Sequence, residues 1–534
     1  MEFSRVEQKK KGRIGPGRIG TMTLISFFGI YASIHAYLLR WTCDDAFISF
    51  RYARNAAQGL GLVFNAGERV EGFTNFLWTA FLIPAIGLGA NPVHWSWLLS
   101  IFCMVGLFAF LGHRQYQHRN QRHWPLLLAG LLSATMHFLV FATSGLETMA
   151  FSASAFIGLY FSLGGDRIGA QIEQVNGYSK DERSLAIGLS LLVITCLLRP
   201  DGFIFFSVAW VSGCLRIFRR KAPLAVGDCT ALIASLAVLA LYEIARYQYY
   251  GAWLPNTFYA KSAYSSYAHQ GLTYLALFYK GYWFWPLLGL ALIIPQKNRL
   301  PSAWVPMLLT AVLWHIYVLW VGGDFMFGRF LIPVLPILGF LIATSIDARL
   351  PAKPRPLLFA PLILLLWFAF AFLRYDPYAR PLAAGEIPQI SGIVDERLFY
   401  PRDTMQELSR LAASYRPVVR SSEVRLAFHG GAAFLIYYMD PVYALEASTG
   451  LTDARLARRR LDKRGRIGHE KEATLDYMRE RKVNVYMWPP DADQADRKIV
   501  FQGFWDNWQI VTYDSKVFRT LKKDPRIQFQ FTGK

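Results

Sequence analysis

The stretch of sequence that decides the fold class is TMTLISFFGIYASIHAYLLRWTCDDAFISFRYARN, Thr21–Asn55. Its first part, Thr21–Leu39, is apolar and close to the roughly 20 residues that a membrane-spanning helix needs. The residues before it are basic, and no small-x-small cleavage site closes the run. A retained anchor therefore fits this stretch better than a cleaved signal peptide, with residues 1–20 as a basic cytoplasmic N-terminus.

Two adjacent carboxylates, Asp44 and Asp45, follow this run at the expected membrane surface. They lose hydration there and repel each other, so the pair requires a structural partner or a chemical role. One interpretation is a helix start, with both acids in the cap and first turn. The other is that one carboxylate acts on a hydroxyl group or binds a cation while the second orients it. The sequence leaves both interpretations open and does not choose between the two aspartates.

The composition extends the membrane interpretation to most of the chain. Of 534 residues, 54% are hydrophobic and 16% are aromatic, and long apolar runs recur. The formal net charge of +20 comes from Lys and Arg clusters between these runs, which is the pattern of cytoplasmic loops. No RNP, zinc-finger or basic-helix pattern is present, so we expect no nucleic-acid partner. Of the five cysteines only Cys43 falls in a polar loop, so no disulfide framework is readable.

Hydropathy and loop charge predict about eleven membrane spans surrounded by lipid. Basic stretches at 113–123, 216–221 and 296–299 and around Arg349 mark the cytoplasmic side. The short apolar stretch Phe76–Gly89 fits a helix near the interface instead. The expected spans are Thr21–Leu39, Val93–Leu111, Trp124–Phe141, Met149–Leu163, Leu185–Leu198, Phe203–Cys214, Ala231–Ile244, Gly271–Pro295, Trp304–Val321, Phe330–Ile346 and Leu357–Leu373.

The composition changes near Arg374, where the apolar runs end. We expect residues 21–374 to form the transmembrane domain and residues 375–534 to form a soluble α/β domain. Strand-like runs alternate there with helical patterns, as in small α/β domains. Because the last span exits the cytoplasm, this domain is expected outside. The strand-like runs are Val424–Phe428, Phe434–Met439, Val442–Leu445 and Val483–Trp488, and the helical patterns are Thr452–Leu461 and Lys471–Arg481.

The unusual polar motifs all fall at the outer ends of the predicted spans. Since the orientation comes from basic clusters elsewhere, this agreement predicts one outward-facing polar cavity under the tail domain. The motifs are DDAF (Asp44–Phe47), VEGFTN (Val70–Asn75), SGLET (Ser144–Thr148), LRPDG (Leu198–Gly202), LPNTFYAK (Leu254–Lys261) and GGDFMFGR (Gly322–Arg329).

The first motifs supply candidate binding residues, each with a structural alternative. VEGFTN offers Glu71 and Asn75. Glu147 in SGLET either caps or bonds a helix, or belongs to the site. In LRPDG, Arg199 either pairs with Asp201 across the turn or holds a phosphate with its planar fork.

The last two motifs lie at the mouths of later spans. In LPNTFYAK, Lys261 either extends to the membrane surface or neutralises a lipid phosphate beside Asn256. In GGDFMFGR, Asp324 and Arg329 either form an internal ion pair or serve the site, and the glycines allow close backbone approach.

Several chemistries lack a signature in the sequence. There is no Walker loop, GxSxG elbow, HExxH helix or paired CxxC set. His429 and His469 have no visible Cys or Ser partner, so we expect core or surface positions for them. No metal site or certain cofactor is assigned, although a divalent cation bridging Asp44 or Asp45 to a phosphate is compatible with the carboxylates.

The ordered set of motifs resembles the membrane-embedded GT-C glycosyltransferases. It is most similar to the terminal arabinofuranosyltransferases of the actinobacterial cell wall and their Gram-negative relatives. DDAFISFRYARN, GLGLVFNAGERVEGFTNFLW, SGLET, LLRPDG, LPNTFYAK and GGDFMFGRFLIPVLP carry the resemblance, which reaches into the tail at STGLTDARLARR and GHEKEATLDYM. It covers nearly the whole chain in order and is less specific for the acceptor.

The resemblance implies a multi-pass inner-membrane enzyme that takes a sugar, here arabinofuranose, from a polyprenyl-phosphate donor outside the cytoplasm. It gives Asp44 or Asp45 the catalytic place, and by position Arg199, Lys261 and Arg329 become candidates for the donor phosphate. The acceptor is an envelope glycan or a glycoprotein such as a pilin. A GT-C enzyme for another lipid-linked sugar, such as a hexose, is the alternative. A transporter is disfavoured because the polar clusters lie at one face, without a repeat.

Overall fold

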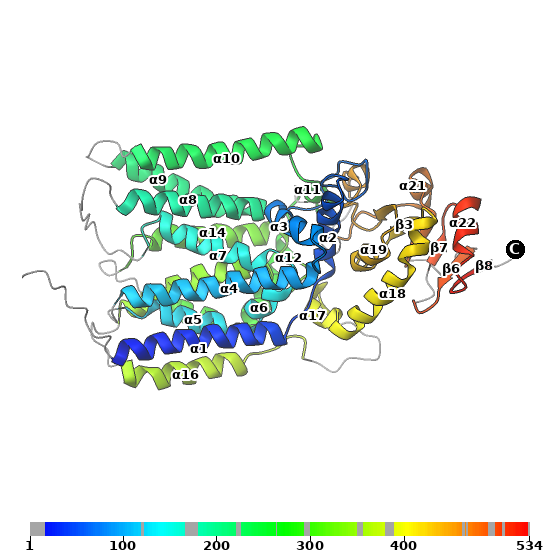
Figure 1. Cartoon of the computed structure of the whole chain (residues 1–534). Helices are drawn as coiled ribbons and strands as arrows, with labels where there is room; N and C mark the ends of the chain where they lie inside the picture. Colours follow the sequence, from blue (N-terminus) through cyan, green and yellow to red (C-terminus); the bar gives the residue numbers. More distant parts are fainter. Residues whose placement is uncertain are drawn as a thin grey trace, which may run out of the picture.

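The computed structural model describes residues 16–118, 122–165, 180–219, 226–262, 264–292, 300–349, 356–379, 389–461, 465, 468–489, 497–504 and 508–531. Figure 1 shows two regions: a bundle of helices that run side by side, and a smaller α/β domain at one end of that bundle. The short helices α2 (Asp44–Ala57) and α11 (Asn256–Ala260) lie where the two regions meet. The basic N-terminal residues 1–15 and the 296–299 stretch lie outside the described residues, as do parts of the other basic loops.

Apolar helices build the bundle. Five of them in the described residues are long and apolar enough to cross a membrane, and a sixth span follows if the bent α5–α6 pair is one span. The remaining apolar helices are shorter. The bundle helices are α1 (Pro16–Leu38), α4 (Pro92–Gln117), α5 (Trp124–Ala134), α6 (Met136–Val140), α7 (Thr148–Ser162), α8 (Lys180–Leu198), α9 (Phe203–Arg219), α10 (Val226–Tyr250), α12 (Ala268–Gly281), α13 (Phe284–Gly289), α14 (Trp304–Val321), α15 (Leu335–Asp347) and α16 (Pro356–Phe372).

The prediction of a polytopic helical membrane protein is thus confirmed, whereas length and composition alone do not establish eleven spans. Two expected spans are interrupted. The run 124–141 bends by 80° between α5 and α6. The run 271–295 divides into α12 and α13, with Tyr282 and Trp283 between them. The interfacial run after Asn75 forms α3 (Phe76–Gly87), whose Pro84 lies inside the helix.

Close helix packing in the bundle depends on glycine. Helices α7 and α8 touch where Gly158 and Gly188 face each other, and a Cβ atom on Gly188 would lie 2.7 Å from the Gly158 carbonyl oxygen. Small residues at such crossings let backbones approach, which is how helices gain packing energy in a lipid environment.

The α/β domain is built on a six-stranded mixed sheet in the order β4-β3-β5-β7-β6-β8. Strands β4, β3 and β5 are parallel, and the other neighbours are antiparallel. A small hairpin and helix α17 (Glu396–Phe399) connect it to the bundle. The other elements are β1 (Gln389–Ile390), β2 (Ile393–Val394), α18 (Arg402–Ser421), β3 (Arg425–Phe428), α19 (Ala433–Met439), β4 (Tyr443–Glu446), α20 (Ala454–Ala457), α21 (Leu475–Glu480), β5 (Val485–Met487), β6 (Arg497–Phe501), β7 (Trp508–Ile510), α22 (Ser515–Leu521) and β8 (Ile527–Phe531).

One predicted strand is wrong: the run 434–439 is the helix α19. A short, wholly apolar run has no periodicity that separates strand from helix. The helix carries no cap of its own, and its first N–H groups bind the carboxylate of Asp44 from the bundle. A contact between residues 389 positions apart in the chain therefore stabilises a helix here, and local sequence does not reveal it.

Candidate active site

Asp44 binds the tail domain. It is buried in the first turn of α2, and its two carboxylate oxygens accept hydrogen bonds from the backbone N–H groups of Ala433 (3.0 Å) and Phe434 (2.9 Å). Burial raises the pKa of Asp44 to about 7, and the two N–H donors oppose this shift. The carboxylate thus caps α19 instead of its own helix, so it joins the bundle to the tail domain.

Asp45 points elsewhere. Its side chain is about 33% exposed, and its Oδ2 lies 3.9 Å from a guanidinium nitrogen of Arg329. Burial raises the pKa of Asp45, whereas the positive charges of Lys261 and Arg329 lower it. Asp45 is therefore the member of the pair that faces cationic side chains and open space.

Arg329 is the centre of a buried group of charges. Its guanidinium lies 3.3 Å from Asp324, 3.7 Å from Glu147 and 3.9 Å from Asp45. These distances exceed the 2.7–2.9 Å that is typical of tight charge-assisted bonds. In addition, its buried Nε has no hydrogen-bond partner among the described residues. The guanidinium thus retains unused hydrogen-bonding capacity.

Glu147 extends this group toward the other motifs. It accepts a hydrogen bond from the Asn75 side chain at 2.9 Å and lies 3.6 Å from Arg199, which itself grips Asp201 with two hydrogen bonds of 3.0 and 2.5 Å. Of the two arrangements open for Arg199, the structure has the pair with Asp201. We call this connected set the Arg329 network: Asp45, Asn75, Glu147, Arg199, Asp201, Asp324 and Arg329.

Glu71 and Asn256 form a separate joint, which we call the Asn256 latch. The Asn256 amide donates to the carbonyl oxygens of Gly450 and Leu451, both at 2.9 Å, and its backbone N–H donates to the Glu71 carbonyl oxygen. The Glu71 carboxylate binds Arg246 at 2.5 Å. The latch therefore ties the first outer loop, α10 and α11 to the tail domain, outside the Arg329 network.

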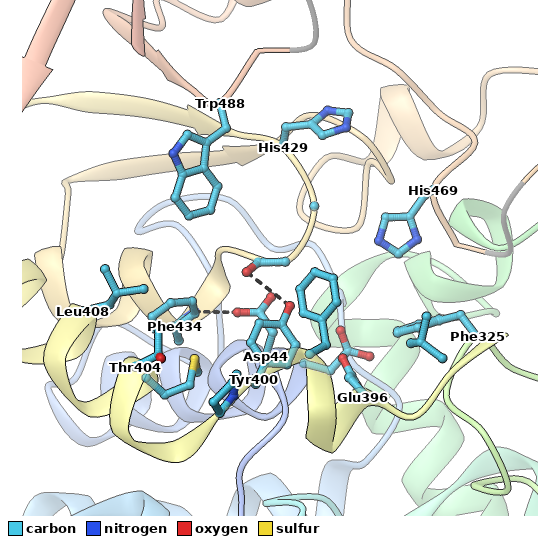
Figure 2. A pocket seen from close by; sticks show the side chains of 17 residues that line it. Asp44, Phe325, Glu396, Tyr400, Thr404, Leu408, His429, Phe434, His469 and Trp488 are labelled. Carbon is cyan, nitrogen blue, oxygen red and sulfur yellow. Dashed lines mark hydrogen bonds between the residues drawn. The ribbon is translucent and has the colours of Figure 1, made fainter. Parts of the chain in front are cut away.

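A cavity of about 350 Å³ opens beside the aspartates, between the end of the bundle and the tail domain (Figure 2). Its size is near the lower end of the roughly 300–1,000 Å³ range of small-ligand pockets. Asp44, Asp45 and Phe325 contribute from the bundle side. The tail domain adds residues that the motifs did not single out as site candidates, namely Glu396, Tyr400, His429, His469 and Trp488.

His429 and His469 thus line the cavity, whereas the sequence analysis expected them at core or surface positions. Glu396 was also missed, because IVDERLFY at 393–400 matches no catalytic pattern. Its neighbour Asp395 lies 3.6 Å from His137 of α6, so the bend in the α5–α6 pair brings a bundle histidine to the tail domain. Burial raises the pKa of Asp395, but His137 and Arg397 lower it by more, so this pKa lies below its usual range.

The described part of the chain contains no preformed metal site of three or more protein ligands. No group of three or more His, Cys, Asp and Glu side chains there is arranged to hold an ion. Asp44 is engaged with backbone N–H groups, which leaves Asp45 as the carboxylate of the pair that a cation would meet.

Comparisons with known proteins identify related chains. No family model matches the sequence. The chain is 30% identical over 364 residues to the terminal β-(1→2)-arabinofuranosyltransferase of Corynebacterium glutamicum, with 61% of this chain and 51% of that protein covered. It is 28% identical over 447 residues to the enzyme of that name from Mycobacterium tuberculosis, with 73% and 67% covered. The chain thus spans about half to two thirds of these relatives.

A solved structure, ArnT from Cupriavidus metallidurans bound to undecaprenyl phosphate, is loosely similar to this chain. Its TM-score is 0.48 at 14% identity, with 82% of this chain and 87% of that chain covered. The sequence relatives support the resemblance on their own, and their matches cover more than half of this chain. By sequence, the chain is therefore a relative of the terminal β-(1→2)-arabinofuranosyltransferases.

Proposed function

We propose that the chain is a GT-C-like glycosyltransferase that moves arabinofuranose from a polyprenyl-phosphate donor to a hydroxyl group of an envelope glycan or glycoprotein. The observation that carries this proposal is the position of Asp45, which faces Arg329 and Lys261 at a cavity of ligand size. The names of the sequence relatives support the sugar and the reaction class.

The proposed chemistry needs a base and a place for negative charge. Asp45 accepts the proton of the acceptor hydroxyl as its oxygen bonds to the anomeric carbon. The bond from that carbon to the phosphate oxygen breaks, and the electron pair leaves with the polyprenyl phosphate. Arg329 and Lys261 stabilise the departing charge, and such fixed charges are most effective where water is excluded.

Asp44 is a positioning residue in this scheme. Because it is hydrogen-bonded to α19, it places the tail domain over the cavity and fixes the first turn of α2, which carries Asp45. The Arg329 network holds its cation among three carboxylates, so Arg329 stays charged and oriented before the donor binds.

The topology belongs to the same proposal. We place residues 1–20 in the cytoplasm, residues 21–374 in the inner membrane as eleven spans, and residues 375–534 outside the cytoplasm. Broken helices such as α5–α6 count as single spans in this scheme. A cysteine at the exposed Glu407 should react with an impermeant reagent in intact cells, above the signal of the parent protein with its five cysteines. If the introduced cysteine is labelled only after lysis, the tail domain lies in the cytoplasm and the proposed orientation is wrong.

The sugar is tested by glycan mass spectrometry of a deletion strain, complemented with the wild-type gene or with Asp45→Asn. Loss of a pentose from envelope glycans or glycoproteins, restored only by the wild-type gene, is the expected result. Loss of a hexose would assign a different lipid-linked sugar. An unchanged glycan profile would contradict the proposal that the protein transfers a sugar.

A further inference from the structure

Glu396 is a buried carboxyl group at the cavity wall that is incompletely hydrogen-bonded by the described residues. Glu396 is only 6% exposed, and its Oε2 has no hydrogen-bond partner among the described residues. The residue lines the same cavity as Asp44 and Asp45. A buried polar atom without a partner reduces stability, so a carboxyl group that is incompletely hydrogen-bonded at the wall of a ligand-sized cavity indicates a bond that a ligand completes.

The backbone around Glu396 is fixed to the bundle. The Val394 N–H donates to the Phe325 carbonyl oxygen, and the Phe327 N–H donates to the Val394 carbonyl oxygen, both at 2.8 Å. The next residue, Asp395, lies 3.6 Å from His137. Glu396 is therefore held in place relative to Asp45 and Arg329 by contacts of the two residues that precede it, as a binding group must be.

The remaining walls indicate what kind of ligand fits. Figure 2 shows Glu396, Asp44 and Tyr400 on one side of the cavity and Trp488 and His429 on the other. Aromatic rings offer flat apolar faces, while the carboxyl groups offer hydrogen bonds. Asp44, Asp45 and Glu396 line this cavity, and the described residues of its wall include no Lys or Arg, so the wall offers an anionic ligand no guanidinium or ammonium partner. A sugar ring is a neutral polyol with an apolar face. It therefore suits both the aromatic rings and the carboxyl groups of this cavity.

We propose that Glu396 and the aromatic wall around Tyr400 and Trp488 form the acceptor subsite, which takes a neutral sugar residue and binds one of its hydroxyl groups through the Glu396 carboxyl group. This inference rests on the proposed transferase function and adds the class of acceptor. The donor phosphate then lies on the opposite side of Asp45, toward Arg329 and Lys261.

The protonation of Glu396 fits this role. Burial raises its pKa well above the usual range of a glutamate, and the carboxylates of Asp45, Asp324 and Asp44 raise it further. A neutral carboxyl group both donates and accepts hydrogen bonds, as a sugar hydroxyl does. Glutamine has the same shape and the same two capacities, so Glu396→Gln should preserve binding whereas Glu396→Ala should not.

The test uses the full chain in detergent or nanodiscs, with a neutral arabinofuranosyl disaccharide and a uronic acid disaccharide as probes. Binding without donor is followed by saturation-transfer NMR, and the acceptor KM and donor hydrolysis are measured with polyprenyl-phosphoryl-arabinofuranose. We expect Glu396→Ala to weaken neutral disaccharide binding and raise the acceptor KM about tenfold. Donor hydrolysis should change less than about twofold, and the melting temperature should not fall.

The matched controls are Glu396→Gln, which should stay within about threefold of wild type, and Glu407→Ala, an exposed carboxylate of α18 outside the cavity, which should change nothing. The uronic acid probe should not bind. Unchanged neutral disaccharide binding in Glu396→Ala overturns the subsite, and so does a Gln variant as weak as the Ala variant.

Failure of the subsite and failure of the proposed function give different results. Transfer of arabinofuranose with neutral disaccharide binding that ignores Glu396 removes the subsite and leaves the function. Binding that depends on Glu396, without transfer from the arabinofuranosyl donor, supports the subsite and removes the proposed donor. Binding of the uronic acid probe in preference to the neutral one overturns the assignment of the acceptor class.

Discussion

The Arg329 network and the Asn256 latch come from equally conspicuous motifs at the same end of the bundle, but their bonding differs. In the latch, Asn256 makes direct hydrogen bonds of 2.9 Å to backbone carbonyls. In the network, Arg329 lies 3.3–3.9 Å from three carboxylates, and its Nε is unpartnered among the described residues. A structural joint uses up its hydrogen bonds, whereas a candidate site keeps some free. This difference gives each region its own expected response to mutation.

Among the basic residues, the largest effect is expected from Arg329. Replacing it with lysine keeps the positive charge beside Asp324 and Glu147 but removes the planar fork. We expect kcat/KM for transfer to fall by about 10²–10³-fold, in the range reported for loss of one transition-state donor. The melting temperature should change little, because the buried carboxylates keep a cation. A lysine variant with wild-type activity would remove Arg329 from the donor site.

The Asn256 latch should show the reverse behaviour. Asn256→Ala leaves the Gly450 and Leu451 carbonyls without their buried donor, which costs about 1–3 kcal/mol of stability. Chemical or thermal unfolding measures this loss. At temperatures where the variant is folded, the rate of transfer should stay within about tenfold of wild type. A stable variant that is inactive would place Asn256 in the site.

A smaller effect is expected from Lys261. Its charge lowers the pKa of Asp45, so Lys261→Met should raise that pKa and shift the acidic limb of the pH–rate profile to higher pH. The exposed Lys516→Met on α22 is the control and should leave the profile unchanged. If the acidic limb of the pH–rate profile does not move, Lys261 does not influence the titration of Asp45.

The sequence predicted what depends on local pattern. Apolar runs predicted the helices of the bundle. In the tail, the strand-like runs predicted β3, β4 and β5. The residues of the Arg329 network came from motifs in five separate segments, because each carries charge at the end of an apolar run. Such charges are costly near lipid and therefore conspicuous.

What the sequence missed depends on contacts between distant segments. The helix α19 is capped by Asp44, a residue distant in the sequence, so the residues of α19 alone do not indicate a helix. Glu396, His429 and His469 reach the cavity only when the tail domain docks on the bundle. A soluble α/β domain contains many polar residues, and nothing local distinguishes the three that face a ligand-sized space. The roles of Asp44 and Asp45 likewise separate only through their partners.

The central claim is that Asp45 acts on the substrates while Asp44 joins two parts of the structure. The most direct measurement compares Asp44→Asn and Asp45→Asn for transfer rate and thermal unfolding in parallel. We predict that Asp45→Asn loses about 10³-fold in rate with an unchanged melting temperature. We predict that Asp44→Asn loses about 1–2 kcal/mol of stability and less than about tenfold in rate. A stable but inactive Asp44→Asn beside an active Asp45→Asn would contradict the account.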